Sequence, residues 1–435
     1  MDNVQPTLDV GNRLSLEGPT VSRREFHEFG ELLKRHREQS AMTQEQAAQR
    51  VDVSRATFAQ WETGRHLPGE QRVHDLDRLL GAGGDLASAV ELARRGHRSR
   101  VVDATEQSVA GRQRSLLGLL RDTRRAFLSQ LSVDEEERPI GWRHNLVPSN
   151  ELPSTLSTAY GLKVLALLDG PDDRTPAVVN TVMDRAVRVG GRIVGWAARS
   201  QAEPRLETTA PALDGLLYAG VPFSREEVER IVRDLLDDTA RQRPFILATA
   251  LEPVLRVAPD SDLAKQLVKA LLDSRREFGG VLLWPEKRLP RDQPLLEPSV
   301  AHTARAVTVL RNAPDDTVGD AVEPAEQWLT QTDNLDGVSE IIRRTVEGGG
   351  REEFPIDHFT SAWVVRALAG ASAPDHRRIH NALTHVWARY DPDYHFWAWG
   401  NGDMPVWMLA DAIGAVKEAA LALYQTPAGA NPGPR

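Results

Sequence analysis

The chain contains no cysteine. A disulfide framework and any metal site built on thiolates are therefore excluded. Residues 1–20 also lack the basic start and the apolar run of a secretory signal peptide. No uncharged apolar stretch approaches the roughly 20 residues that are needed to cross a bilayer. From these absences we expect a cytoplasmic protein that is not bound to a membrane.

The chain also lacks a positive net charge, since its formal charge at pH 7 is −9. This balance argues against a protein that coats nucleic acid along its whole length, although a local module remains compatible with it. Nine arginines lie between Arg94 and Arg125, beside only three acidic residues, and the acidic excess lies further on. With 435 residues, 41% of them hydrophobic, we expect two or three domains.

Residues 26–80 show the pattern of a small helical bundle. Apolar spacing over 26–38 predicts an amphipathic helix. Thr43 is a good N-cap, and Gln46 three residues later completes a capping box. Ser54 is expected to cap a helix from Arg55 to about residue 63, and a further helix is expected from about 71 to 80. The inward positions of these helices are predicted to be Ala47, Ala48, Val51, Phe58, Trp61, Val73, Leu76, Leu79 and Leu80.

Three stretches in this order resemble the phage-repressor/Cro (XRE-type) helix-turn-helix. They are Thr43-Gln44-Glu45-Gln46-Ala47-Ala48, then Val53-Ser54-Arg55-Ala56-Thr57-Phe58, then Trp61-Glu62-Thr63-Gly64-Arg65 with Pro68. The resemblance covers about 60 residues. It departs at Asp52, where the family usually has glycine.

The resemblance implies that the helix after Ser54 enters the major groove of double-stranded DNA, where Arg55 pairs with guanine and Gln60 with adenine. The base-facing residues that it implies are Arg55, Ala56, Thr57 and Gln60. The phosphate-contacting residues that it implies are Thr43, Gln44, Ser54 and Arg65. A homodimer associated with the nucleoid is expected. The alternatives are that these residues form a solvated face, or that the domain mediates protein contacts only.

The region after residue 137 has no obvious strand pattern and contains apolar residues at helical spacing. A recurring element consists of a tryptophan, a loop with proline, and a Thr-Ala or Ser-Ala start to an apolar helix. Its anchors recur about every fifty residues. They are Thr158, Thr209, Thr249, Thr303, Ser361 and Ala410. Six helical hairpins of this size can close into a ring around a central cavity, and the alternative is an open solenoid.

This repeat resembles the α/α toroid of the terpene-cyclase and protein-prenyltransferase superfamily over roughly residues 138–425. The chemistry of that superfamily does not carry over. Neither Asp169-Gly170-Pro171-Asp172-Asp173 nor Asp391-Pro392-Asp393-Tyr394 fits the Asp-x-Asp-Asp acid motif of the cyclases. The zinc site of the prenyltransferases needs a cysteine, which this chain lacks.

Other candidate sites in this region are weak. His376, His380 and His385 have no glutamate of the His-Glu-x-x-His kind between them, and adjacent arginines repel a cation, so surface or capping roles are expected. We predict no catalytic residues, no metal and no cofactor. A candidate ligand pocket is formed by the densest aromatic cluster. Its residues are Tyr394, Phe396, Trp397, Trp399 and Trp407.

The sequence thus predicts an all-α protein with a five-helix helix-turn-helix domain and a toroid-like repeat domain. The predicted divisions are an extension (1–22), the helix-turn-helix domain (23–85), a basic helical connector (86–137), the toroid-like domain (138–425) and a tail (426–435). We expect a non-enzymatic transcription regulator whose larger domain senses a small apolar ligand or a partner protein. The alternatives are a cyclase-like enzyme fused to a DNA-binding head, and an antitoxin-type scaffold that binds a partner protein.

Overall fold

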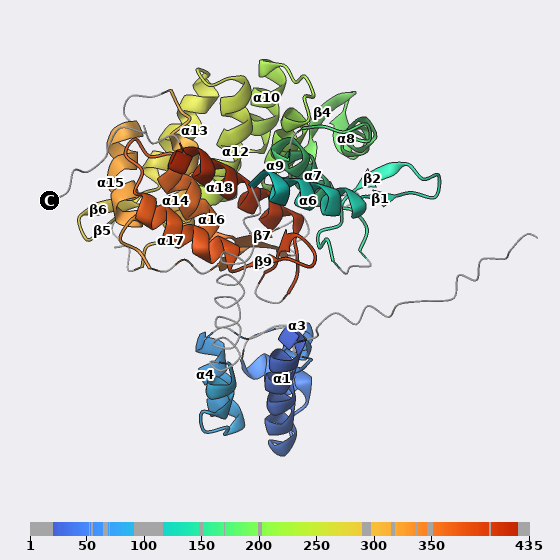
Figure 1. The fold of residues 1–435 in the computed structure, drawn as a ribbon, viewed down its shortest axis with the longest axis vertical. Helices are drawn as coiled ribbons and strands as arrows, with labels where there is room; N and C mark the ends of the chain where they lie inside the picture. Colours follow the sequence, from blue (N-terminus) through green and yellow to red (C-terminus); the bar gives the residue numbers. More distant parts are fainter. Residues whose placement is uncertain are drawn as a thin grey trace, which may run out of the picture. The chain divides into compact units, whose positions relative to one another are not determined.

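The computed structural model divides the chain into two compact units, Met1–Glu106 and Gln107–Arg435 (Figure 1). Each unit is described by itself. The residues that the structure describes are 21–51, 53, 55–63, 68, 70–90, 116–147, 151–168, 170–198, 202–288, 297–314, 318–333, 335, 337–345, 351–399 and 402–424.

The smaller unit is helical throughout its described part. Its helices are α1 (Val21–Gln39), α2 (Gln44–Arg50), α3 (Arg55–Glu62) and α4 (Glu70–Leu80), and residues 85–90 are also helical. Phe29, Ala47, Phe58, Leu76 and Leu86 are almost fully buried and join all five segments in one core. The predicted amphipathic helices are therefore present, and their apolar stripes face one another.

The larger unit is also mostly helical. Its helices are α6 (Leu116–Ser129), α7 (Thr155–Leu167), α8 (Thr175–Asp184), α9 (Leu206–Tyr218), α10 (Arg225–Leu235), α11 (Asp238–Arg241), α12 (Pro244–Val257), α13 (Asp262–Asp273), α14 (Val300–Leu310), α15 (Gly319–Leu329), α16 (Thr360–Ala369), α17 (His376–Trp387) and α18 (Val406–Tyr424). Helix α6 supplies Leu119, Leu120 and Phe127 to the core of this unit, so this part of the basic segment packs with the body that follows it.

Six of these helices pack in a cyclic order. Helix α7 packs against α9, α9 against α12, α12 against α14, α14 against α16, α16 against α18, and α18 against α7. Each of the six anchors that mark the sequence repeat lies on one of these helices. At one contact a Cβ placed on Gly215 of α9 would stand 2.3 Å from the carbonyl oxygen of Ala159 on α7, so only glycine permits this approach.

The repeat has a physical basis in buried tryptophans that lock one helix to the next. The indole N–H groups of Trp142, Trp196 and Trp284 donate to carbonyl oxygens on α6, α8 and α13, over 3.0, 2.8 and 2.9 Å. The hydroxyl oxygens of Thr209 and Thr303 accept from the backbone N–H groups of Trp196 and Trp284. In both copies a tryptophan and a threonine that follows it therefore join two helices to the loop between them.

In the part of the larger unit that the structure describes, five two-stranded antiparallel hairpins lie between the helices, and the sequence pattern did not predict them. They pair β1 (Ser132–Val133) with β2 (Pro139–Gly141), β3 (Ala186–Val189) with β4 (Arg192–Trp196), β5 (Arg276–Phe278) with β6 (Val281–Leu283), β7 (Val338–Thr345) with β8 (Arg351–His358), and β9 (Tyr390–Asp391) with β10 (Phe396–Trp397). In the β7–β8 hairpin Val338 pairs with His358 and Glu340 with Ile356, which brings Glu340 near His358.

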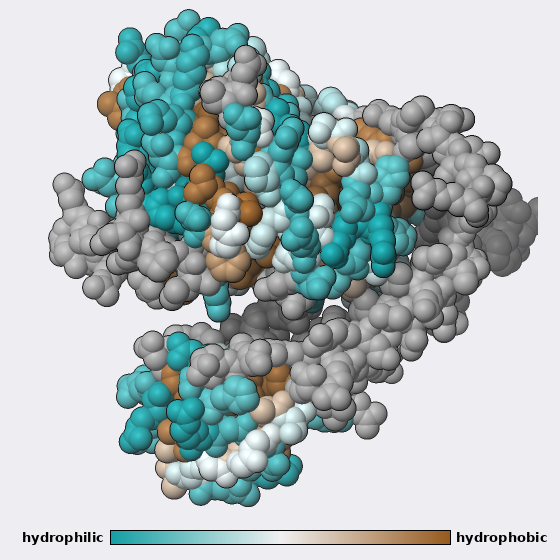
Figure 2. Space-filling model, turned by 90° about the vertical axis from the view of Figure 1, so that its left-hand side faces the viewer, coloured by the Kyte–Doolittle hydropathy of each residue, from teal (hydrophilic) through white to brown (hydrophobic). Residues whose placement is uncertain are grey.

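The surface drawn in Figure 2 mixes hydrophilic residues with scattered hydrophobic ones. Single exposed apolar side chains of this kind are normal on a folded domain. In the described part of the chain, no helix combines the length and the apolar character that crossing a membrane requires.

Candidate functional site

The start of α2 is fixed by the capping box that the sequence predicted. The backbone N–H of Gln46 donates to the hydroxyl oxygen of Thr43 over 3.2 Å, and the backbone N–H of Thr43 donates to the side-chain oxygen of Gln46 over 2.9 Å. Two N–H groups at the helix start are thus satisfied reciprocally. Ala47 and Ala48 follow on the buried face, where small side chains let α3 approach α2.

A charged network ties the end of α3 to α1 and α2. Glu62 on α3 is 5% exposed and accepts from Arg37 on α1 over 2.5 Å and from Gln44 on α2 over 2.7 Å. Arg37 also donates to the carbonyl oxygen of Met42 over 2.8 Å. Gln44, predicted to touch a phosphate, therefore bonds to Glu62 in this structure. The network fixes the orientation of α3 relative to the other two helices.

Helix α3 is amphipathic in the sense that the sequence predicted. Phe58 and Trp61 are buried, with ring centroids 5.9 Å apart, and Arg55 in the first turn is exposed. The other predicted base-facing residues, Ala56, Thr57 and Gln60, lie on α3, and their side chains are outside the described residues. Of the predicted phosphate-contacting residues, Thr43 is exposed, whereas Ser54 and Arg65 lie outside the described residues. Asp52, where the family usually has glycine, also lies outside them.

Comparison with known families agrees with this geometry. Residues 28–90 match the family model of a helix-turn-helix domain. Among the curated proteins, none matches the chain. The smaller unit therefore contains a helix-turn-helix domain, which implies DNA binding by this part of the chain.

The interior of the helical cycle in the larger unit holds a network of charged side chains. Lys163 on α7 donates to Asp214 on α9 over 2.7 Å and lies 3.6 Å from Glu252 on α12. Glu252 also accepts from Arg305 on α14 over 2.7 Å. The guanidinium of Arg305 stacks on the ring of Trp363 on α16, 3.8 Å from its centroid. Charge, rather than an apolar lining, therefore occupies the space that these helices face.

Asp411 on α18 belongs to the same interior. Burial raises the pKa of Asp411 to about 6, against the attraction of Arg305, Arg366 and Lys163, which favour the ionised form. An aspartate whose pKa rises on folding stabilises the folded state only while it is protonated. This contribution is complete below about pH 4, is lost as the pH rises to about 6, and stays lost above that value.

We therefore predict that Asp411→Asn stabilises the larger unit at neutral pH. The expected gain at pH 7.5 is about 3 kcal/mol, because the variant never has to bury the charge. The gain should shrink to about 0.5 kcal/mol at pH 4 and vanish below about pH 3, where the wild-type carboxyl is protonated in both the folded and the unfolded state. Urea unfolding at a series of pH values measures this difference. A gain that stays constant from pH 4 to pH 7.5 would contradict the assigned burial cost.

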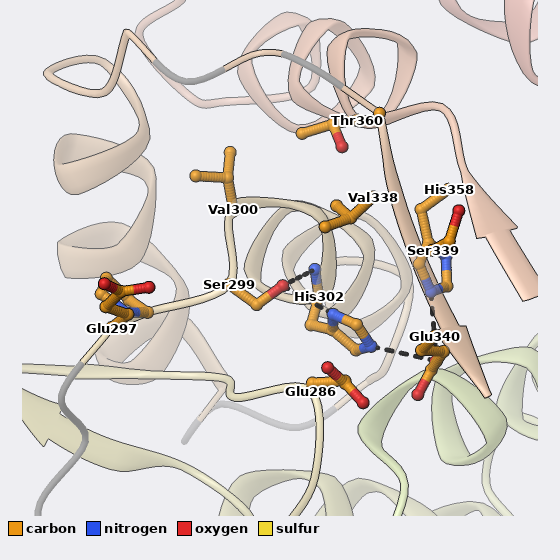
Figure 3. Close-up of a pocket in the computed structure, with 12 residues that line it drawn as sticks. Glu286, Glu297, Ser299, Val300, His302, Val338, Ser339, Glu340, His358 and Thr360 are labelled. Carbon is orange, nitrogen blue, oxygen red and sulfur yellow. Dashed lines mark hydrogen bonds and ion pairs between the residues drawn. The ribbon is translucent and has the colours of Figure 1, made fainter. Parts of the chain in front are cut away.

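A second polar cluster lies beside a cavity of about 440 Å³ (Figure 3). His302 on α14 and His358 on β8 both direct an imidazole at Glu340 on β7 (Figure 3). The Nε2 atoms lie 3.2 and 3.1 Å from the same oxygen, Oε1. Arg243, directly before α12, donates to the other oxygen, Oε2, over 2.9 Å. The hydroxyl of Ser299 lies 2.6 Å from Nδ1 of His302.

Burial and hydrogen bonding set the protonation of this cluster. Burial raises the pKa of Glu340, but its hydrogen bonds and electrostatic interactions with His302 and His358 outweigh this effect and bring the pKa down to about 2. Burial lowers the pKa of His358, against the opposing hydrogen bond to Glu340. At neutral pH the cluster therefore holds an ionised carboxylate and, at His358, a neutral imidazole.

The residue types in this cluster occur both in sites of nucleophilic catalysis and in metal sites. A serine, a histidine and a glutamate stand in sequence, as in a catalytic triad. However, Ser299 is the N-cap of α14, and its oxygen already accepts from the backbone N–H of His302. The buried atoms Nε2 of His302, Nε2 of His358 and Oε1 of Glu340, by contrast, have the types and proximity of metal ligands.

Sequence reasoning missed this cluster. His302 occurs in the Pro298-Ser299-Val300-Ala301-His302-Thr303 stretch, which the sequence pattern marks only as a repeat anchor. Glu340 and His358 lie on a hairpin that was not predicted. The histidines that were weighed as metal ligands, His376, His380 and His385, are all exposed on α17.

The predicted aromatic pocket is occupied by packing contacts between its own members and their neighbours. Phe396 and Trp397 are each 1% exposed, and Trp397 packs on Tyr390 with ring centroids 4.9 Å apart. Trp399 and Trp407 meet edge to face at 5.6 Å, and Tyr394 is 46% exposed. None of the five lines the cavity beside Glu340. A ligand pocket at this cluster stays a prediction.

Proposed function

We propose that the protein is a sequence-specific DNA-binding transcription regulator of the XRE type. The observation that carries this proposal is the first turn of α3, which presents Arg55 to solvent while Phe58 and Trp61 anchor the helix in the core. A helix held in this way can enter a major groove without rearranging the bundle. The link from Glu62 to α1 and α2 supports it, because it makes the orientation of α3 rigid.

In the proposed complex, Arg55 forms a bidentate pair with guanine and Gln60 with adenine, while Ala56 and Thr57 contact neighbouring base edges. Thr43, Gln44, Ser54 and Arg65 contact phosphates and set the register. Gln44 exchanges its bond to Glu62 for a phosphate when DNA binds. Two copies of the chain bind half-sites about one helical turn apart, as dimeric helix-turn-helix proteins do.

For the larger unit we propose an α/α toroid that acts by binding rather than by catalysis. The cyclic packing of six helices supports this architecture, as does the position of every repeat anchor on one of them. An effector can bind the DNA-compatible arrangement of the chain with a different affinity from its other arrangement. The affinity of the protein for its operator would then change by the ratio of these two effector affinities. The charged interior argues for a polar effector at the edge of the ring rather than an apolar one at its centre.

The decisive experiment compares DNA recognition by the wild type and by Arg55→Ala/Gln60→Ala. The wild type is first used to select fragments from a random duplex library. The double variant should bind these fragments no more tightly than it binds bulk DNA. Each lost base contact is expected to cost about 1–3 kcal/mol of discrimination, while residual salt-dependent binding persists. Footprinting and affinity measured at several salt concentrations give both quantities.

The matched control is Arg78→Ala, which removes one exposed arginine from α4, outside the proposed recognition helix. It should keep the selected sequence preference and change only the overall affinity. An unchanged footprint in the double variant would remove α3 as the recognition helix. Absence of any sequence-selective binding by the wild type would overturn the proposed function.

A further inference from the structure

The distances within the His302, Glu340 and His358 cluster are close to those of ligands around one metal ion. A tetrahedral ion with bonds of about 2.1 Å separates its ligand atoms by about 3.4 Å. The two Nε2–Oε1 distances are 3.2 and 3.1 Å, and the three candidate ligand atoms all lie within 4.8 Å of one another. Three ligand atoms at these separations can surround one ion.

The groups behind these ligands orient them in the way that metal sites require. Ser299 holds Nδ1 of His302, so Nε2 is directed at the carboxylate. When Nε2 binds a metal, the ring proton moves to Nδ1 and donates to the Ser299 hydroxyl, which can accept as well as donate. Arg243 fixes Glu340 through Oε2 and leaves Oε1 facing both histidines.

The cavity beside the cluster favours a cation. Three glutamates line it, Glu286, Glu297 and Glu340, and no lysine or arginine is found among the described residues of its lining. Arg243 lies behind it and is shared by Glu340 and Glu286, at 2.9 and 3.1 Å. The positive charge of Arg243 is thus more than balanced by the two carboxylates that it contacts.

The cavity also contains a polar group without a partner. The hydroxyl of Thr360 is buried, lines the cavity and has no hydrogen-bond partner among the residues that the structure describes. A buried hydroxyl of this kind generally has a partner, either protein or a bound ligand. A water or a polar ligand bound in the cavity would supply one.

We propose that His302, His358 and Glu340 bind one divalent ion of the zinc class, with the remaining coordination position open to the cavity. Two imidazoles and one carboxylate are the ligand set of zinc sites that keep a position for water or another ligand. The open position can take an oxygen or nitrogen donor of a small polar molecule. The proposal does not depend on DNA binding, and its test uses none.

The test titrates the full-length chain with Co²⁺, after treatment with a chelator, and follows the visible absorption of the bound ion. One Co²⁺ per chain should bind, and one Zn²⁺ per chain should displace it. His302→Ala, His358→Ala and the isosteric Glu340→Gln should each weaken binding by at least about 100-fold. Ser299→Ala, which removes only the orienting group, should weaken it about 10-fold.

The matched control is His380→Ala, which removes an exposed histidine of α17 and should leave both stoichiometry and affinity unchanged. Zn²⁺ should raise the melting temperature of the wild type and of this control, and should not raise that of Glu340→Gln. Because Glu340→Gln keeps the size of the side chain, it tests the site even if an alanine variant fails to fold. No absorption band in the wild type, or equal binding in the wild type and Glu340→Gln, overturns the proposal.

Discussion

Trp61→Ala is expected to unfold the helix-turn-helix domain while the larger unit stays folded. Trp61 is 5% exposed and belongs to a core that is separate from that of the larger unit. Truncating a buried tryptophan costs about 3–5 kcal/mol, because apolar contacts are lost and a cavity remains. A domain of this size has a total stability of only a few kcal/mol to about 10 kcal/mol, so the loss removes much or all of it.

Hydrogen exchange of the full-length chain, followed by mass spectrometry on peptides, measures this loss within one unit. Amides of α1 and α3 should lose at least about 100-fold in protection, since 1.4 kcal/mol corresponds to tenfold in an equilibrium constant. Peptides from α14 and α16 should be unchanged. Arg55→Ala is the matched control on the same helix, and its α1 amides should keep wild-type protection. Wild-type exchange in Trp61→Ala would show that the indole does not anchor this core.

The helix-turn-helix domain could be predicted because its signals are local. A capping box at Thr43 and Gln46 involves residues three apart, and the burial of Phe58 and Trp61 follows from their spacing along one helix. The interaction of Gln44 with Glu62 was missed, because it joins two helices and depends on their relative orientation.

In the larger unit, the repeat could be predicted because two of its copies reuse the same interactions. The backbone N–H groups of Trp196 and Trp284 donate to the hydroxyl oxygens of Thr209 and Thr303, and their indole N–H groups donate to carbonyl oxygens of the preceding helices. Such interactions leave a tryptophan followed by a threonine in the sequence, 13 residues later in one copy and 19 in the other. The charged interior leaves no such pattern, since Lys163 and Glu252 stand far apart along the chain and meet only when the cycle closes.

The cluster beside the cavity was missed for a related reason. His302, Glu340 and His358 come from a helix and from both strands of a hairpin. The register of β7 with β8 brings Glu340 near His358, and that register is a tertiary feature. Sequence spacing identifies metal ligands when they share one helix face or one loop, which is why the exposed histidines of α17 drew attention instead.

Glu252→Ala is expected to destabilise the larger unit by about 3–5 kcal/mol, the usual cost of removing one partner from a buried ion pair. Glu252 accepts from Arg305 over 2.7 Å and lies 3.6 Å from Lys163. Its removal leaves Arg305 without its carboxylate partner in the interior. The midpoint of urea unfolding of the larger unit measures the cost. Glu323→Ala on the exposed face of α15 is the control, and should change stability by at most about 0.5 kcal/mol.

The pH dependence of this cost has a definite sign. Burial raises the pKa of Glu252, but attraction by Arg305 and Lys163 outweighs it, so the pKa in the folded state lies below the unfolded value of about 4.5. The ionised group therefore stabilises the fold above that pH, and this contribution is lost as the pH falls further. The difference between wild type and Glu252→Ala should accordingly shrink on acidification.

A double variant distinguishes the cost of leaving a charge unpaired from the cost of losing packing contacts. In Glu252→Gln/Arg305→Met both charges of the pair are removed, and Lys163 keeps its 2.7 Å contact with Asp214. The double variant should cost less than the sum of its two single variants, because neither charge is left buried alone. Additive costs would mean that the two side chains stabilise the larger unit independently, and that the network contributes through packing rather than through its charges.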